Sequence, residues 1–375
     1  MVINYIDRQT FIALSPILRD EFQWTHADFA TLLLSFRIAY TLMQALAGRM
    51  LDRLGTRRGL ALGVAFYSVV AVLTAGAQSL GGFRILRGLL GLGEASNWPG
   101  AIKASAEWFA PRERAWAVAL FDAGTALGGV IAPFLALALY SWFQDWRPVC
   151  VVTASLGGLW VVVWLACCRS SADATSPAAL AVEIGGDRSC GHGETAIVTS
   201  PVGWRQLLAC RQIWGIMLGR FLLDPYWFFI GEWFAIYLDS RGFALEQSVL
   251  GMAAPLAASI VGNFAGGALS SSLIRRGWPV GRSRRTVLAL FGPSMVVVAL
   301  ALLVSDYATL ILLFSYGNFA YSACSTMFLS LPADVFHPRA VASASGLGGT
   351  AAGAGTILST WLIGQVADQA SFAGV

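Results

Sequence analysis

Charge is scarce in this chain. Only 12% of its 375 residues are Asp, Glu, Lys or Arg, whereas 57% are hydrophobic. A soluble globular domain typically carries about 25% charged residues. The shortage therefore excludes an ordinary soluble domain and predicts an all-α polytopic membrane protein. The net charge is only +4, and most arginines fall in loops that face one side of the membrane, so we expect no nucleic-acid partner.

Metal-ligand and cofactor patterns are missing as well. The 6 cysteines show no disulfide or zinc spacing, and most of them lie in apolar runs where they serve as small packing residues. The glycine clusters at 91–93 and 346–355 follow no strand and precede no P-loop lysine, so close helix packing explains them better. We expect no metal, no cofactor and no enzyme activity.

Long apolar runs dominate what is present. A helix needs about 20 apolar residues to cross a bilayer. That length predicts about eleven spans, near 1–19, 27–51, 57–77, 82–104, 114–140, 147–168, 211–238, 247–274, 285–304, 307–332 and 340–367.

The polar segment 169–200 divides these spans into two groups. We predict an N-terminal six-helix bundle over 1–168, a cytoplasmic linker over 169–210 and a five-helix bundle over 211–375. Arginines are concentrated in the loops after the second, fourth, eighth and tenth spans, which the positive-inside rule assigns to the cytoplasm. We therefore expect a cytoplasmic amino terminus and a multi-pass protein of the plasma membrane, in a bacterium the inner membrane.

Charged residues inside the apolar runs indicate a binding site. Asp7 and Arg8 are adjacent in the first span, and Arg87 and Glu94 lie in the fourth. A charge at the bilayer centre costs about 2.5–3.5 kcal/mol on insertion scales, so their presence favours a polar cavity. Arginine binds carboxylates through a planar fork that stays protonated. We therefore predict a carrier for a small organic anion, with Arg8 and Arg87 binding its carboxylate.

A second inference concerns coupling. Burial and a neighbouring arginine have opposite effects on the pKa of a carboxyl group. A conformational change that moves Asp7 or Glu94 relative to Arg8 or Arg87 would therefore change its proton affinity. Structural ion pairing remains the alternative for these four residues. Arg220 and Asp224, four residues apart in the seventh span, fit an internal ion pair or a gate equally well.

Several motifs resemble known families. The loop Gly48-Arg49-Met50-Leu51-Asp52-Arg53-Leu54-Gly55-Thr56-Arg57-Arg58 resembles the signature of the major facilitator superfamily, and 267–277 is a degraded second copy with Ser271 in place of Asp52. The stretches 4–8, 40–44, 87–99 and 103–109 resemble the anion:cation symporter family, nearest to bacterial hexuronate transporters.

The resemblance implies two pseudo-repeated helical bundles that work by alternating access. It implies proton binding at Asp7 and Glu94, and a cytoplasmic latch formed by Gly48, Asp52, Arg53, Gly55, Arg57 and Arg58. It favours Tyr40, Gln44 and Thr125 as sugar-binding residues, and Trp227 could stack on the apolar face of a sugar ring. The expected function is proton-coupled symport of a hexuronate or related sugar acid by a monomer.

Two departures from the family pattern leave alternatives open. Members have twelve spans, and here the front of the first and the whole twelfth are expected to be missing. Arg37 and Asp122 are charged where the hexuronate carriers would have neutral residues, and Asp122 could pair with Arg37. The alternatives are a carrier of another organic anion, such as a galactonate, tartrate or aromatic acid, or an inactive, non-transporting fragment of such a carrier.

Overall fold

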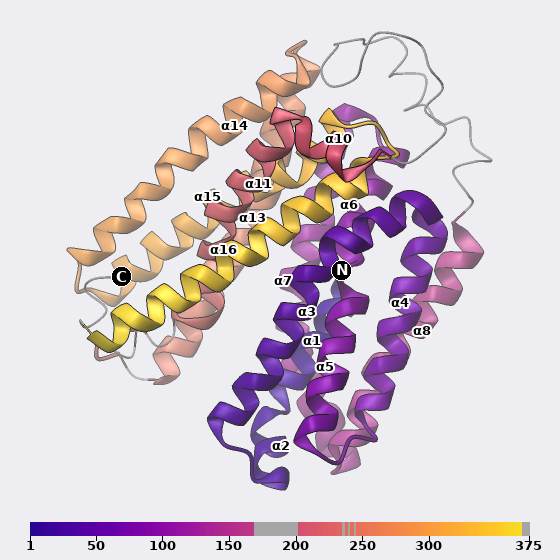
Figure 1. Cartoon of the computed structure of the whole chain (residues 1–375). Helices are drawn as coiled ribbons and strands as arrows, with labels where there is room; N and C mark the ends of the chain where they lie inside the picture. Colours follow the sequence, from indigo (N-terminus) through magenta and orange to yellow (C-terminus); the bar gives the residue numbers. More distant parts are fainter. Residues whose placement is uncertain (169–201, 235–236, 239–240, 244, 370–375) are drawn as a thin grey trace. The chain divides into compact units, whose positions relative to one another are not determined.

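The computed structural model describes residues 1–168, 202–234, 237–238, 241–243 and 245–369, and these are almost entirely helical (Figure 1). In the first half the helices are α1 (Val2–Ala13), α2 (Ser15–Phe22), α3 (His26–Leu54), α4 (Thr56–Thr74), α5 (Leu80–Glu94), α6 (Asn97–Trp108), α7 (Pro111–Phe143) and α8 (Trp146–Cys167). The all-α prediction is confirmed.

The second half contains α10 (Trp204–Ala209), α11 (Arg211–Glu232), α13 (Leu245–Arg275), α14 (Val280–Ser294), a 3₁₀ helix η2 (Met295–Leu302), α15 (Tyr307–Val335) and α16 (Val341–Gln369). Most of the predicted linker, 169–201, lies outside the described residues. Its last residues form the short helix α10.

The helices form two compact units. The N-terminal unit comprises Met1–Trp108, Gly124–Ala209 and Phe336–Thr350, and the C-terminal unit comprises Phe109–Ala123, Cys210–Val335 and Ala351–Val375. In the N-terminal unit α3 packs along α5 and α4 packs along α8, whereas α13 and α15 are the main packed pair of the C-terminal unit (Figure 1). The strictly sequential division into bundles stays a prediction.

Helix starts follow local capping chemistry. Thr25 and Asp28 form a reciprocal capping box at the start of α3, because the Thr25 hydroxyl accepts from the Asp28 N–H and the Asp28 carboxylate accepts from the Thr25 N–H. Ser79 caps α5 and Asp145 caps α8 in the simpler way. At the other end of α3, Gly55 has φ +78°, which a glycine adopts without strain, and α4 begins at the next residue.

Two predicted spans are each broken into two helices. The span expected at 82–104 ends as α5 at Glu94 and restarts as α6 at Asn97. Pro99 has no N–H to donate to the carbonyl oxygen of Ala95. The Ser96 hydroxyl donates to the carbonyl oxygen of Gly93 at 2.9 Å, and such a side-chain bond competes with the backbone hydrogen bonds of a helix. The span expected at 1–19 changes helix at Leu14, two residues before Pro16. The predicted spans therefore contain breaks that the length of the apolar runs does not reveal.

The helix surfaces fit a membrane. Seven helices among the described residues are long and apolar enough to cross one. Many large apolar side chains are exposed along them, among them Leu42, Leu120, Phe134 and Leu222, which a soluble protein would bury. An aromatic cluster at one end of the N-terminal unit joins helices α2, α5 and α8, where Phe83 lies 5.4 Å from Phe22 and 5.8 Å from Trp146 between ring centroids.

A buried charge network anchors the C-terminal unit. Asp334, near the end of α15, accepts from Arg114 of α7 at 3.2 Å and from Arg284 of α14 at 2.9 Å. Arg284 has 0% of its side chain exposed and also donates to the Ser270 hydroxyl at 2.7 Å. One carboxylate therefore pairs with two arginines from separate helices.

We predict that Asp334→Asn lowers the free energy of unfolding by about 3–5 kcal/mol, because two buried guanidinium groups lose their counter-charge. Thermal unfolding of the purified protein measures the effect. Asp20→Asn, at an exposed position of α2, is the matched control and should leave the melting temperature unchanged. Equal melting temperatures for both variants would contradict the role assigned to Asp334.

Candidate functional site

An ion pair between Arg8 of α1 and Glu94 of α5 forms the centre of the site. The Nη2 of Arg8 lies 2.6 Å from Oε2 of Glu94, and Nε of Arg8 donates to the same oxygen at 3.1 Å. The Glu94 side chain is fully buried, whereas 17% of the Arg8 side chain remains exposed. The other carboxylate oxygen of Glu94 has no hydrogen-bond partner among the described residues.

Aromatic rings surround the Arg8 guanidinium. Its Cζ lies 5.1 Å from the ring centroid of Tyr5, 4.7 Å from that of Phe36 and 5.0 Å from that of Tyr40. The faces of aromatic rings attract a cation, and they also exclude water from it. The cage holds Arg8 charged in a place where a carboxylate, from the protein or from a ligand, is its natural counter-ion.

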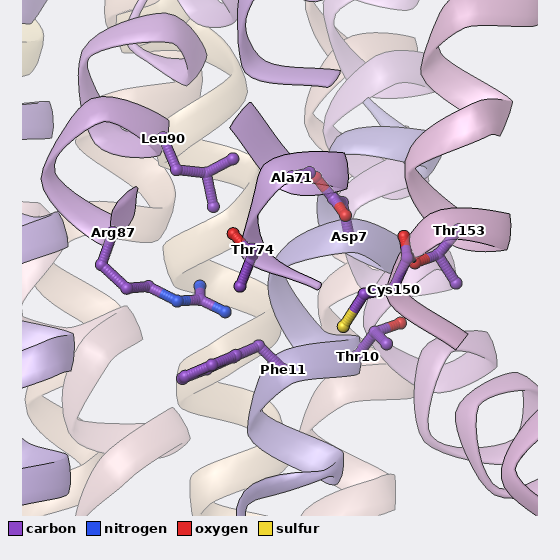
Figure 2. Close-up of a pocket in the computed structure, with 9 residues that line it drawn as sticks. All are labelled: Asp7, Thr10, Phe11, Ala71, Thr74, Arg87, Leu90, Cys150 and Thr153. Atoms are coloured by element: carbon purple, nitrogen blue, oxygen red, sulfur yellow. Dashed lines mark hydrogen bonds between the residues drawn. The ribbon is translucent and has the colours of Figure 1, made fainter. Parts of the chain in front are cut away.

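Asp7 and Arg87 form the second half of this charge cluster. The Cζ of Arg87 lies 3.2 Å from the ring centroid of Phe11, and only 5% of Arg87 and 8% of Asp7 are exposed. Asp7 lies within electrostatic range of Arg87, Glu94 and Arg8. The structure therefore brings together the four residues predicted from the sequence. Arg8 is hydrogen-bonded to Glu94, and Asp7 and Arg87 line one small cavity (Figure 2).

Close contact between α3 and α5 aligns these groups. A Cβ atom on Gly91 would lie 2.5 Å from the carbonyl oxygen of Phe36, so only glycine permits this approach. Gly91 is three residues before Glu94, and Phe36 belongs to the cage of Arg8. The glycine thus positions the ring and the carboxylate around the same guanidinium, in agreement with the packing role predicted for this glycine cluster.

The four other residues predicted to bind substrate do not all lie beside the Arg8–Glu94 ion pair. Tyr40 contacts Arg8, as described above. Gln44 is buried, and its side-chain oxygen occupies the space that a Cβ of Gly349 would need. Thr125 is buried in α7 between Gly124 and Gly128, which contact Val2 of α1. The structure places Trp227 in the C-terminal unit, where its ring stacks on Tyr321 with centroids 5.9 Å apart.

Asp52, near the end of α3, connects the latch motif to α6 and to α16. Asp52 accepts from Nζ of Lys103 at 2.7 Å and from the N–H groups of Ala342 at 3.3 Å and Ser343 at 2.7 Å. Ala342 and Ser343 open α16, whose N-terminal N–H groups attract a carboxylate. Lys103 was not among the residues predicted for the latch, although a lone lysine at the end of an apolar run was a usable signal.

Of the other latch residues, Gly48 and Arg57 contact neighbouring helices, whereas two arginines are exposed. Gly48 permits close approach, since a Cβ there would lie 2.2 Å from the Ala342 carbonyl oxygen. Arg57 donates to the carbonyl oxygen of Leu165 in α8 at 2.7 Å. Arg53 and Arg58 are exposed. The latch role of all these residues stays a prediction.

A further polar group lies inside the C-terminal unit. Arg220 and Asp224 are ion-paired along α11, as one of the two sequence alternatives predicted. The Asn263 amide, oriented to satisfy its neighbours, donates to Asp122 Oδ2 and to the Ser322 carbonyl oxygen, both at 3.0 Å. The predicted pairing of Asp122 with Arg37 stays a prediction. In the described part of the chain, no group of three His, Cys, Asp or Glu side chains could hold a metal ion.

Comparison with known proteins identifies the family. The model of the Major Facilitator Superfamily matches residues 1–360. The chain belongs to this superfamily of transporters. Membership confirms the predictions of a membrane-spanning transporter and of a protein that is not an enzyme.

Curated relatives and solved structures agree with this assignment. The Hexuronate transporter of Escherichia coli (strain K12) is 33% identical over 99% of this chain and 86% of its own length. The Galacturonate transporter of Dickeya chrysanthemi is 30% identical over 71% of this chain and 77% of its own length. The crystal structure of the human organic anion transporter MFSD10 (TETRAN) matches with a TM-score of 0.71 at 16% identity, covering 98% of this chain and 92% of that one. The structural match confirms the fold predicted from the sequence.

We predict opposite effects for two glycines of α5. Gly91→Ala should lower the free energy of unfolding by about 1–3 kcal/mol, because its methyl group collides with the backbone of α3. Gly88→Ala meets no atom within 4 Å and should raise stability by up to about 1 kcal/mol, as alanine usually does in a helix. Thermal unfolding of both variants checks the pair. A Gly91→Ala protein at least as stable as Gly88→Ala would exclude the positioning role.

Proposed function

We propose that this chain is a proton-coupled symporter that carries a hexuronate or a related sugar acid by alternating access. The observation that carries the proposal is the Arg8–Glu94 ion pair inside its aromatic cage. A sugar acid offers one carboxylate, which can take the place of Glu94 on the planar guanidinium of Arg8. It also offers hydroxyl groups for the neighbouring polar side chains.

Exchange of carboxylates explains why a proton must accompany the substrate. Removing Glu94 from Arg8 while it remains ionised would leave a buried, unpaired charge, which is strongly unfavourable. Protonation neutralises Glu94 and frees Arg8 for the incoming anion. In the return step Glu94 loses its proton and reclaims Arg8, so the empty carrier again holds a neutral ion pair.

Asp7 supplies a second proton site of the same kind. It lies within electrostatic range of Arg87 and Glu94, so its charge depends on how those groups are placed. Two protons carried with one monoanion would move a net charge of +1. A membrane potential of 100 mV then contributes about 2.3 kcal/mol, which corresponds to roughly 50-fold accumulation.

The proposal also assigns the residues that bind the sugar and the orientation of the chain in the membrane. Tyr40, whose ring lies against Arg8, would bind the hydroxyl groups of the sugar, together with Gln44 and Thr125. The stacking role predicted for Trp227, which lies in the C-terminal unit, stays a prediction. Arg87, one of the two arginines predicted to bind the carboxylate, is assigned to Asp7 because both line the same cavity. The amino terminus is cytoplasmic and the carrier is a monomer.

Another organic anion is the principal alternative within the same fold. The relatives named above are called hexuronate and galacturonate transporters, which favours a uronate for this chain. The decisive measurement is uptake of radiolabelled glucuronate into proteoliposomes with an imposed inward proton gradient. We predict uptake above the level of empty liposomes and competition by galacturonate. Stronger competition by galactonate or benzoate would reassign the substrate.

We predict that Glu94→Gln abolishes uptake driven by a proton gradient while leaving substrate exchange in place. Glutamine keeps the size of the side chain but does not titrate, so Arg8 stays available and the proton is no longer required. Glu113→Gln, at an exposed position paired with Arg112, is the matched control and should transport normally. Unchanged pH dependence of uptake in Glu94→Gln would remove this residue from the coupling mechanism.

A further inference from the structure

A small polar cavity lies inside the N-terminal unit, among α1, α4, α5 and α8. Its volume is about 10 Å³, close to the space that one water molecule needs. Figure 2 shows Arg87 reaching over the Phe11 ring toward the side chains that α1 and α8 contribute. The lining residues are Asp7, Thr10, Phe11, Ala71, Thr74, Arg87, Leu90, Cys150 and Thr153.

Three buried polar atoms on this lining have no hydrogen-bond partner among the described residues. They are Oδ2 of Asp7, Oγ1 of Thr10 and Nε of Arg87. Their side chains are at least nine-tenths buried, with 8%, 1% and 5% of the residue surface exposed. Leaving such atoms unsatisfied is costly, and buried polar groups in proteins nearly always find a partner.

The other two polar side chains of the lining do not supply that partner. The Thr74 hydroxyl donates to the Val70 carbonyl oxygen at 3.0 Å, and the Thr153 hydroxyl donates to the Val149 carbonyl oxygen at 3.0 Å. Their protons are used within their own helices. The three unsatisfied atoms therefore need a small ligand that can both donate and accept.

We infer that one water molecule binds in this cavity and bridges Asp7, Thr10 and Arg87. Water can donate to the Asp7 carboxylate, accept from Nε–H of Arg87 and bond the Thr10 hydroxyl, which gives the usual number of partners for a buried water. A sugar acid does not fit, since pockets for organic ligands measure about 300 Å³ or more. The cavity is thus a hydration site separate from the substrate position on Arg8.

A role for this site in proton exchange rests on the proposed function. The two proton-binding residues then have different surroundings: Glu94 faces Arg8, whereas Asp7 faces the bound water. Successive residues of a helix diverge by about 100°, so Asp7 and Arg8 leave α1 in different directions. Glu94 exchanges its proton where the substrate arrives, at Arg8. Asp7 exchanges its proton with the bound water inside the helical unit, and a bound substrate does not block that exchange.

Radiolytic footprinting tests the water directly and needs neither substrate nor a proton gradient. X-rays split a bound water into hydroxyl radicals that oxidise adjacent side chains, including buried ones. Cys150 lines the cavity and should be oxidised faster than Cys324, another buried cysteine that does not line it. Ala71→Val, which fills the cavity, should reduce the oxidation of Cys150 to the level of Cys324. Equal rates for the two cysteines in the unmodified protein would overturn the hydration site.

A second variant keeps the test decisive if Ala71→Val does not fold. Thr10→Val preserves volume and removes one partner of the water, so oxidation of Cys150 should slow and the pH dependence of uptake should shift. Thr356→Val is the matched control, because Thr356 is buried and its hydroxyl bonds within its own helix. Slower oxidation with an unchanged pH profile would keep the water but overturn its role in proton exchange at Asp7, leaving symport at Arg8 and Glu94 intact.

Discussion

Charge neutralisation inside the N-terminal unit is the constraint on which the proposed mechanism depends. Asp7, Glu94 and Arg87 are buried, and only 17% of the Arg8 side chain is exposed. An ionised group in such surroundings is costly without an opposite charge beside it. The arrangement is neutral only while every carboxylate faces a cation. Adding one substrate anion upsets the balance, and adding a proton restores it. In the proposed mechanism, coupling between anion and proton would then follow from burial itself.

In each unit a buried ion pair contacts the start of a helix, but through opposite groups. In the N-terminal unit Asp52 joins Lys103 to the first N–H groups of α16. In the C-terminal unit Arg284 joins Asp334 to the carbonyl oxygen of Pro111, at the start of α7. The second copy of the loop motif has Ser271 in place of an acid, and α15 provides the acid instead. The degraded repeat has thus kept a buried charged contact while exchanging the residues that make it.

The sequence located the charged residues of the candidate site, but it did not predict how they pair. Apolar run length and intramembrane charge located most helices and all four charged residues, because a buried charge is costly wherever the chain folds. Pairing was not predictable, since Arg8 and Glu94 are 86 residues apart and only packing brings them together. Lys103, Asp334 and the hydration site were missed for the same reason. The breaks at Pro16 and Pro99 were readable in the sequence, but hydropathy alone averages over them.

The ion pair between Asp52 and Lys103 leaves the surface of the chain almost without exposed amino groups. Lys103 is its only lysine, and that ammonium group is buried against Asp52 with 4% of the side chain exposed. Reagents that acylate amines therefore find little to attack here apart from the terminal amino group. Any condition that parts α16 from Asp52 would uncover the lone lysine side chain. Labelling of Lys103 would therefore report separation of α16 from Asp52.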